Sequence, residues 1–118
     1  MIDLQERWTP TQADFDAFAA VSGDDNAIHV DPAFCAGTTF GRTVSHGMLL
    51  YAKLSGMLKR HDAGLAQVSQ TLMFPNPAFT GEELILNIKE DAPGHLRMQV
   101  TRAQDGAECL TGEAVVTC

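Results

Sequence analysis

Residues 45–60 read SHGMLLYAKLSGMLKR, and this stretch predicts the longest helix of the chain. Apolar side chains cover a wide arc of that helix, which is typical of a helix buried on several sides. Lys59 and Arg60 fall in its last turn, where positive charge interacts favourably with the helix dipole. We therefore expect a buried central helix against which the rest of the chain packs. The apolar positions are Met48, Leu49, Ala52, Leu54, Met57 and Leu58.

Beyond Gly64 the spacing of apolar residues changes from helical to twofold, which predicts strands. In the clearest case, Leu96, Met98 and Val100 alternate with polar residues. Such alternation indicates an antiparallel sheet with one buried face, and only the 45–60 helix is apolar enough to cover it. The predicted fold class is α+β, a curved antiparallel sheet wrapped around one long helix. The expected strands are 66–74, 83–90, 95–102 and 109–117.

The N-terminal part of the chain predicts a second helix. Residues 2–8 fit either a short strand or an extended arm. Thr9 then fits an N-cap, with Pro10 at the first helical position and Gln12 placed to complete a capping box. This helix should run to about Val21 and end at Gly23, which can adopt the left-handed conformation of a helix terminus.

Length and composition predict a single domain spanning residues 1–118. Eight Lys and Arg residues stand against fifteen Asp and Glu, giving a net charge of -7, so we expect no nucleic-acid partner. Cys35, Cys109 and Cys118 lack CxxC spacing, which indicates reduced thiols. No segment resembles a leader or a membrane span, so we expect a cytoplasmic protein that binds no membrane.

The stretch 22–32, SGDDNAIHVDP, concentrates ionisable side chains between a glycine and a proline. Asp24 and His29 lie five residues apart in an expected loop, and apolar neighbours on both sides of His29 should pin it against the core. An imidazole held beside a carboxylate is a ready general acid/base pair. The structural alternative is a polar cluster that only caps helices, since Asp and Asn often do so in loops.

A second candidate feature is Ser45-His46-Gly47, which opens the central helix. The first amides of a helix have no intrahelical partners and suit an anion or a developing oxyanion. Gly47 lets a ligand carbonyl approach the backbone, whereas His46 is more typical of packing or capping than of catalysis. His29 and Asp31 near Cys35 lack a second cluster of ligand residues, so we expect no metal.

The segments 22–32 and 40–48, SGDDNAIHVDP and FGRTVSHGM, together closely resemble the hydratase-2 motif of MaoC-like, (R)-specific enoyl-CoA hydratases. The resemblance covers nearly the whole chain and implies the hot-dog fold, whose subunits usually pair, so we expect a homodimer or a higher homo-oligomer. It implies that Asp24 and His29 hold a water that attacks the β-carbon of a trans-2-enoyl-CoA, giving an (R)-3-hydroxyacyl-CoA. The thioester is the substrate, and no further cofactor is expected.

The same resemblance implies roles for residues around the pair. The Gly47 amide would hold the thioester oxygen, Asn26 would brace the loop, and Ser55 would lie on the central helix near the water. Weaker expectations concern substrate binding: Met57 and Leu58 as walls of the acyl pocket, and Arg42, on its charge alone, for a carrier phosphate.

Two residues depart from the family pattern. Ala27 stands where the motif usually has proline, and Asp25 stands where the family commonly has an apolar or aromatic residue. These departures keep two alternatives open: an acyl-CoA thioesterase on the same scaffold, and a non-catalytic hot-dog subunit that only binds acyl thioesters. Fold analogy does not separate the three functions, because one scaffold hosts many chemistries.

Overall fold

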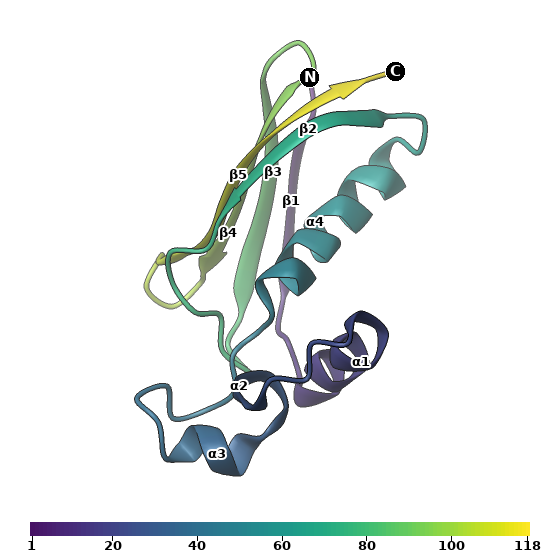
Figure 1. The fold of residues 1–118 in the computed structure, drawn as a ribbon. Coiled ribbons are helices and arrows are strands. Elements are labelled where there is room, and N and C mark those ends of the chain that lie inside the picture. The colour runs from purple at the N-terminus through teal and green to yellow at the C-terminus, as the bar shows by residue number, and fades with distance from the viewer.

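The computed structural model describes residues 1–118 as a five-stranded sheet with one long helix on its face and three shorter helices at one end (Figure 1). No helix is both long and apolar enough to cross a membrane. The strands are β1 (Asp3–Trp8), β2 (Ala66–Met73), β3 (Leu84–Ala92), β4 (His95–Arg102) and β5 (Glu108–Thr117). The helices are α1 (Gln12–Ser22), α2 (Ala27–Val30), α3 (Pro32–Ala36) and α4 (Gly47–His61).

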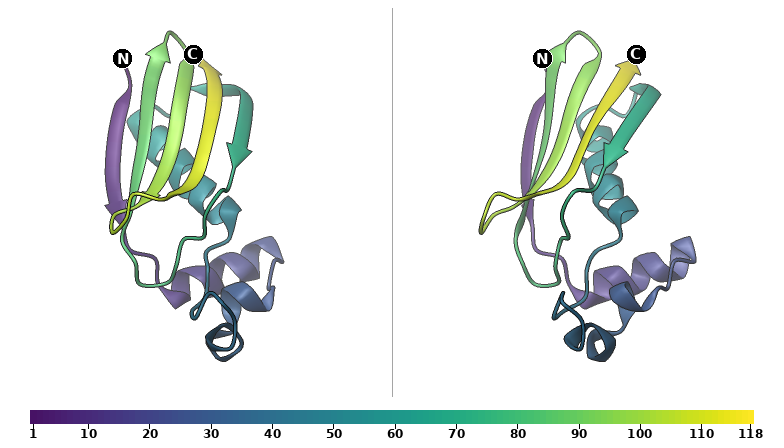
Figure 2. Two further views of the ribbon diagram at one scale, coloured as in Figure 1. Left: turned by 90° about the vertical axis from the view of Figure 1, so that its left-hand side faces the viewer. Right: turned by 60° about the vertical axis from the view of Figure 1, so that its left-hand side comes forward.

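The sheet is antiparallel throughout, with the strand order β1-β3-β4-β5-β2. β1 and β2 are therefore the two edge strands, as the turned views of Figure 2 show. Residues 2–8, for which the sequence left two possibilities, form the edge strand β1, which pairs with β3 from Asp3–Lys89 to Trp8–Leu84. The four strands predicted after Gly64 are all confirmed, with ends that differ by no more than two residues.

The central helix α4 lies across one face of this curved sheet and builds the core with it (Figures 1 and 2). Leu50, Leu54 and Met57 of α4 are buried against the inward-facing positions of β3, β4 and β5. The predicted α+β architecture, a sheet wrapped around one buried helix, is confirmed. The sheet contributes Leu84, Leu86, Ile88, Leu96, Met98, Val100, Leu110 and Ala114.

The start of α1 corrects the prediction for the N-terminal helix. The N-cap is Thr11, not Thr9, and the capping box is completed by Asp14 instead of Gln12. A carboxylate is a stronger acceptor for the backbone N–H of the cap than a neutral amide, which favours the later register. Gln12 makes tertiary contacts instead: its amide donates to the His29 carbonyl at 2.8 Å and its carbonyl accepts from Thr43 at 2.6 Å. The predicted end is confirmed, since Gly23 follows α1 with φ 79°.

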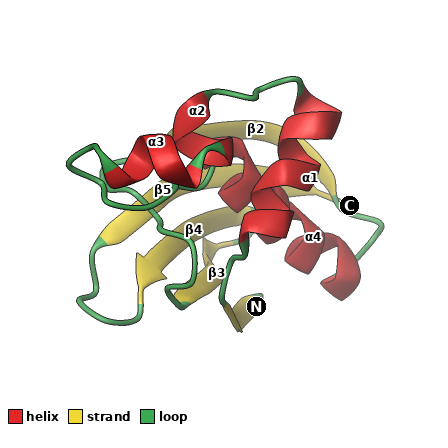
Figure 3. Cartoon of the chain, turned by 90° about the horizontal axis from the view of Figure 1, so that it is seen from below, coloured by secondary structure: helices red, strands yellow, loops and turns green.

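The short helices α1, α2 and α3 gather at one end of the molecule, beside the start of α4 (Figures 1 and 3). Seen from below, they surround the point where the chain enters α4 (Figure 3). The two sequence segments singled out for chemistry, residues 22–32 and 45–47, thus lie at the same end of the fold.

Candidate active site

The His29 side chain is carried by the one-turn helix α2, so the expectation of a loop at this position is wrong. Asn26 caps that turn, because its side-chain oxygen accepts from the Ile28 N–H at 3.2 Å. This contact gives a physical basis to the bracing role expected for Asn26. Ala27 occupies the first position of the turn, where proline is favoured but not required.

Asp31 ends α2 and begins α3. Its carboxylate accepts from the Phe34 N–H at 3.0 Å, and Pro32 follows at the first helical position. Asp25 is exposed and contributes to neither helix. Of the acidic residues in this stretch, only Asp24 lies beside His29.

His29 is pinned to the segment that leads into α4, as expected from its apolar neighbours. The Val44 N–H donates to the Ile28 carbonyl at 2.9 Å, and the Val44 carbonyl lies 2.8 Å from His29 Nδ1. Because a carbonyl oxygen only accepts, Nδ1 must carry hydrogen. In the neutral ring the other nitrogen, Nε2, is then an acceptor with a free lone pair.

Asp24 faces that nitrogen. The distance from Asp24 Oδ2 to His29 Nε2 is 3.7 Å, which is too long for a direct hydrogen bond. Two acceptors at such a separation can both hydrogen-bond to one water molecule between them. His29 is 8% exposed, whereas the Asp24 side chain is 55% exposed, so the pair joins a buried base to a solvent-accessible carboxylate.

His46 lies directly against this pair. Its ring stacks on His29 with 3.8 Å between centroids and 23° between the ring planes, and its Nε2 lies 2.8 Å from the Asp24 backbone carbonyl. It is the N-cap residue of α4 but makes no side-chain capping bond. The packing role suggested by the sequence is therefore confirmed, while the close approach to both Asp24 and His29 is new.

Asp24, His29 and His46 form a group whose ligand atoms lie within 4.8 Å of one another. Nitrogen lone pairs lie in the ring plane, so two nearly parallel imidazoles do not converge on one ion with the tetrahedral geometry that zinc prefers. This geometry disfavours a shared metal, and the expectation of no metal stays a prediction.

Gly47 is the first residue of α4, and its N–H has no intrahelical partner. A Cβ built at this position would lie 2.8 Å from the Phe74 ring, closer than side-chain contacts allow. Glycine thus lets the Phe74 ring pack directly against the start of α4. Phe74 immediately follows β2, so this edge strand reaches the start of α4.

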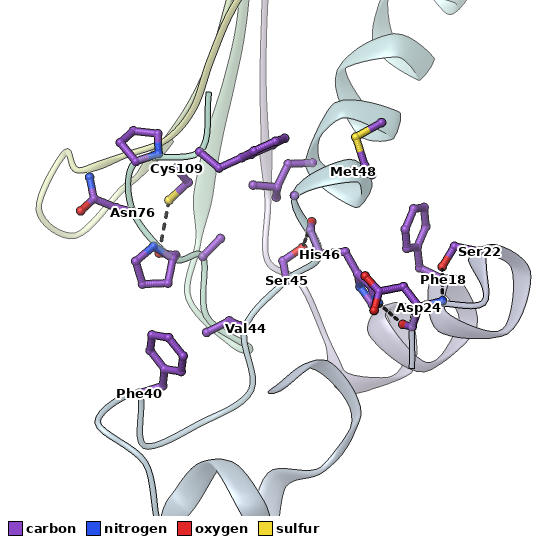
Figure 4. A pocket seen from close by; sticks show the side chains of 16 residues that line it. Phe18, Ser22, Asp24, Phe40, Val44, Ser45, His46, Met48, Asn76 and Cys109 are labelled. Atoms are coloured by element: carbon purple, nitrogen blue, oxygen red, sulfur yellow. Dashed lines mark hydrogen bonds between the residues drawn. The ribbon is translucent and has the colours of Figure 1, made fainter. Parts of the chain in front are cut away.

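One cavity of about 490 Å³ joins these features (Figure 4). Asp24, His46 and Gly47 line it together, whereas His29 lies behind His46 and is not part of the lining. The remaining wall is largely apolar, so the cavity suits an acyl thioester better than a sugar or a nucleotide base. Among its apolar residues are Phe18, Phe40, Met48, Phe74, Pro75 and Cys109.

Cys109 and Phe74 line the cavity although the sequence did not mark either of them. Burial raises the pKa of the Cys109 thiol to about 11, so the group stays protonated at neutral pH. Its Sγ lies 3.4 Å from the Pro77 carbonyl, on the side of the cavity opposite Asp24 (Figure 4). Cys109 therefore acts as an apolar wall and not as a nucleophile.

The predicted site residues further along α4 do not line this cavity. Ser55 and Leu58 line a separate small hollow near the far end of α4, and Met57 is 3% exposed in the core. Ser55 is eight positions beyond Gly47, or roughly 12 Å along a helix. Met57 and Leu58 do not line the cavity at Asp24, because α4 carries both residues away from it, and their role as walls of the acyl pocket stays a prediction.

Arg42 is exposed but already engaged. Its guanidinium donates to the Thr80 carbonyl at 2.8 Å and lies 3.7 Å from the Glu82 carboxylate. A carrier phosphate would have to compete with Glu82 for it. Exposed ion pairs contribute little, typically ~0.2–1 kcal/mol, so such an exchange is inexpensive.

Comparison with known proteins identifies relatives over most of the chain. The model of the MaoC-like domain family matches residues 2–109. The (R)-specific enoyl-CoA hydratase of Aeromonas caviae is 42% identical over 113 residues, covering 88% of this chain and 83% of the relative. The 3-hydroxybutyryl-CoA dehydratase of Methylorubrum extorquens is 32% identical over 108 residues, covering 90% of this chain and 67% of that protein.

Solved structures give the same similarity in three dimensions. The (R)-hydratase of A. caviae superposes with a TM-score of 0.88 and 37% identity, covering 98% of this chain and 93% of its own. An R-hydratase of Pseudomonas aeruginosa superposes with a TM-score of 0.88 and 30% identity, covering 98% of this chain and 78% of its own.

Proposed function

This chain belongs to the MaoC-like domain family, and from that premise we propose that it is an (R)-specific enoyl-CoA hydratase. Its fold is the hot dog, as the resemblance implied, and its enzyme class is that of the hydro-lyases. The reaction we propose is the reversible addition of water to a trans-2-enoyl-CoA, giving an (R)-3-hydroxyacyl-CoA. The Asp24–His29 pair carries this proposal, because it combines a fixed imidazole acceptor and a carboxylate 3.7 Å apart.

The proposed chemistry uses one water held by the pair. The water oxygen attacks the β-carbon while one of its protons passes to the pair. The electrons of the double bond move towards the carbonyl, and the resulting enolate takes a proton from the pair at the α-carbon on the same face. We assign the two proton transfers to Asp24 and His29 together, because Asp24 Oδ2 and His29 Nε2 face each other at 3.7 Å.

In this proposal the Gly47 N–H donates a hydrogen bond to the thioester oxygen and stabilises the negative charge that develops there. It lines the same cavity as Asp24 and points from the positive end of the α4 dipole. Loss of one such donor typically costs ~10²–10³ in rate. Asn26 contributes by capping the turn that carries His29, and Ser55 remains a predicted contributor without a contact to the pair.

Substrate binding in this proposal is mostly apolar. The cavity wall contacts the acyl and thioester part of the substrate. Arg42 is the candidate for binding a carrier phosphate, which would replace Glu82 as its partner. The net charge of -7 opposes a polyanionic ligand over the rest of the surface, which makes a local cation necessary.

We further propose that the protein is a homodimer, in the cytoplasm. The edge strand β2 pairs with β5 on one side only and exposes several apolar side chains. Val68 is 64% exposed and Met73 is 67% exposed, as expected of a strand that another copy covers. Phe74 extends the same apolar edge to the mouth of the cavity, so a partner at β2 would lie near the site.

Hydration is tested by mixing the protein with crotonyl-CoA and longer or branched enoyl-CoA thioesters while following the conjugated enoyl absorbance and free thiol. Loss of absorbance without thiol release supports the hydratase. Thiol release would assign the thioesterase alternative instead. Saturable acyl-CoA binding with neither reaction would assign the non-catalytic subunit, and either of these results overturns the proposal.

A further inference from the structure

His46 contains the one buried side-chain polar atom that has no hydrogen-bond partner in this structure. The residue is 2% exposed, and the unpartnered atom is Nδ1. A buried polar group without a partner is costly, and native proteins keep few of them. An apolar aromatic residue would fill the same volume without that cost, so the histidine calls for an explanation.

The second ring nitrogen of His46, Nε2, explains why a histidine is present. His46 Nε2 lies 2.8 Å from the Asp24 carbonyl oxygen, which only accepts, so Nε2 must carry hydrogen. In the neutral ring Nδ1 is then unprotonated and has no donor partner, and the neighbouring Phe18 and Phe15 rings offer none. The orphaned atom is thus the consequence of keeping a donor aimed at Asp24.

Few other contacts hold Asp24 in place. Its N–H donates to the Ser22 hydroxyl at 3.2 Å, and its Oδ1 accepts from the Asn26 N–H at 3.4 Å, both near the upper limit for hydrogen bonds. The bond from His46 is the shortest of the three and the one that connects Asp24 to the buried start of α4.

His46 also fixes the second member of the pair. Its ring stacks on His29, whose Nδ1 is bonded to the Val44 carbonyl, so the His29 ring is held by both its face and its edge. The His46 side chain therefore contacts both the backbone of Asp24 and the ring of His29. The two groups 3.7 Å apart are thus both in contact with His46.

We propose that His46 is a positioning residue, which holds Asp24 at its working distance from His29 through the Nε2–H bond to the Asp24 carbonyl. The proposal rests on the proposed hydratase function and assigns His46 no proton transfer of its own. Misplacing a catalytic group by about 1 Å can cost ~10² in rate, which sets the size of the effect.

Two substitutions separate the hydrogen bond from the ring. His46→Phe keeps the aromatic stack and removes the donor, while His46→Gln keeps an Nε2–H donor and removes the ring. We expect His46→Phe to lower kcat about 10²-fold with little change in KM, and His46→Gln to recover at least ~10-fold of that loss. His61→Phe, at the exposed end of α4, is the matched control and should leave kcat unchanged.

Stability separates positioning from mere packing. His46→Phe also removes the orphaned Nδ1, so its Tm should be no lower than that of the wild type although its kcat falls. Wild-type kcat in His46→Phe overturns the proposal. So does a His46→Gln variant as impaired as His46→Phe, since restoring the donor would then recover none of the lost activity.

A measurement without substrate keeps the proposal testable if the protein proves inactive. Long-range ¹H–¹⁵N NMR of the histidine rings should show His46 as the Nε2–H tautomer and His29 as the Nδ1–H tautomer. An Nδ1–H tautomer at His46 overturns the positioning role. Inactivity of the wild type with the expected tautomers would refute the hydratase function while leaving the hydrogen bond established.

Discussion

At the scale of single residues, the site depends on which nitrogen of His29 is free. The bond between Nδ1 and the Val44 carbonyl leaves Nε2 facing Asp24, so the imidazole can accept a proton on the side where the carboxylate lies. A histidine of the opposite tautomer would present a donor to the carboxylate and could not act as a base there.

Asp24→Asn and His29→Ala should each lower kcat/KM by ~10²–10⁴, because each removes one half of the acid/base pair. Steady-state hydration of an enoyl-CoA measures the effect, and thermal unfolding checks that the fold is retained. Asp25→Asn is the matched control, since Asp25 is an exposed neighbour outside the site. Normal turnover in either site variant would refute the assignment of the pair.

Gly47→Ala should abolish most activity for a steric reason that a second substitution can relieve. The added methyl group would lie 2.8 Å from Phe74, which must move or push the start of α4 away. Gly47→Ala combined with Phe74→Ala should therefore recover activity over Gly47→Ala alone, measured as kcat/KM against Phe74→Ala as the reference. A double variant no better than Gly47→Ala would show that the alanine harms the amide site directly.

At the scale of elements, the helix α4 was predictable because its apolar arc and the twofold pattern of the strands are local signals. The start of α1 was not predictable, because both Thr9 and Thr11 are suitable N-cap residues. Asp14 completes a capping box with Thr11 and so decides between them. Gln12 could not be assigned from spacing either, since its partners His29 and Thr43 lie far along the chain.

Thr11→Ala should reduce the free energy of unfolding by about 1 kcal/mol, because it removes the N-cap of α1. Thr9→Ala should change it far less, since exposed Thr9 lies outside the helix. Urea unfolding of both variants gives the comparison. An equal or larger loss of unfolding free energy in Thr9→Ala would show that Thr9 is the N-cap, as the sequence alone suggested.

The site shows the same limit of local reasoning. Asp24, His29 and Gly47 lie in contiguous motifs and could be proposed from the sequence. The stacking of His46 on His29 and the packing of Phe74 over Gly47 join segments separated in the chain, so no spacing reports them. Met57 is buried in the core, and the sequence could not separate the two roles, because a buried apolar residue on a central helix suits a core and a pocket wall equally well.

At the scale of the whole molecule, the two edges of the sheet differ. β1 is a mostly polar edge, whereas β2 exposes Val68 and Met73 and continues into Phe74. Burial of such an edge by a second copy would remove apolar area from water and bring the partner near the cavity.

Substitution of both Val68 and Met73 by lysine should convert the proposed dimer to a monomer, because it places two charges on the apolar edge. Size-exclusion chromatography with light scattering measures the mass. Val21→Lys is the control, since Val21 is 82% exposed on α1, away from β2. A wild-type monomer, or a double variant that remains dimeric, would contradict this interface.

The central claim is that one water, held between Asp24 and His29, adds across one face of the enoyl thioester. The most direct test is hydration of crotonyl-CoA in D₂O, followed by stereochemical analysis of the product at both carbons. A single (R)-3-hydroxybutyryl-CoA with deuterium added at the α-carbon on the same face as the hydroxyl is the predicted result. An (S) alcohol, or deuterium distributed over both faces of the α-carbon, would contradict it.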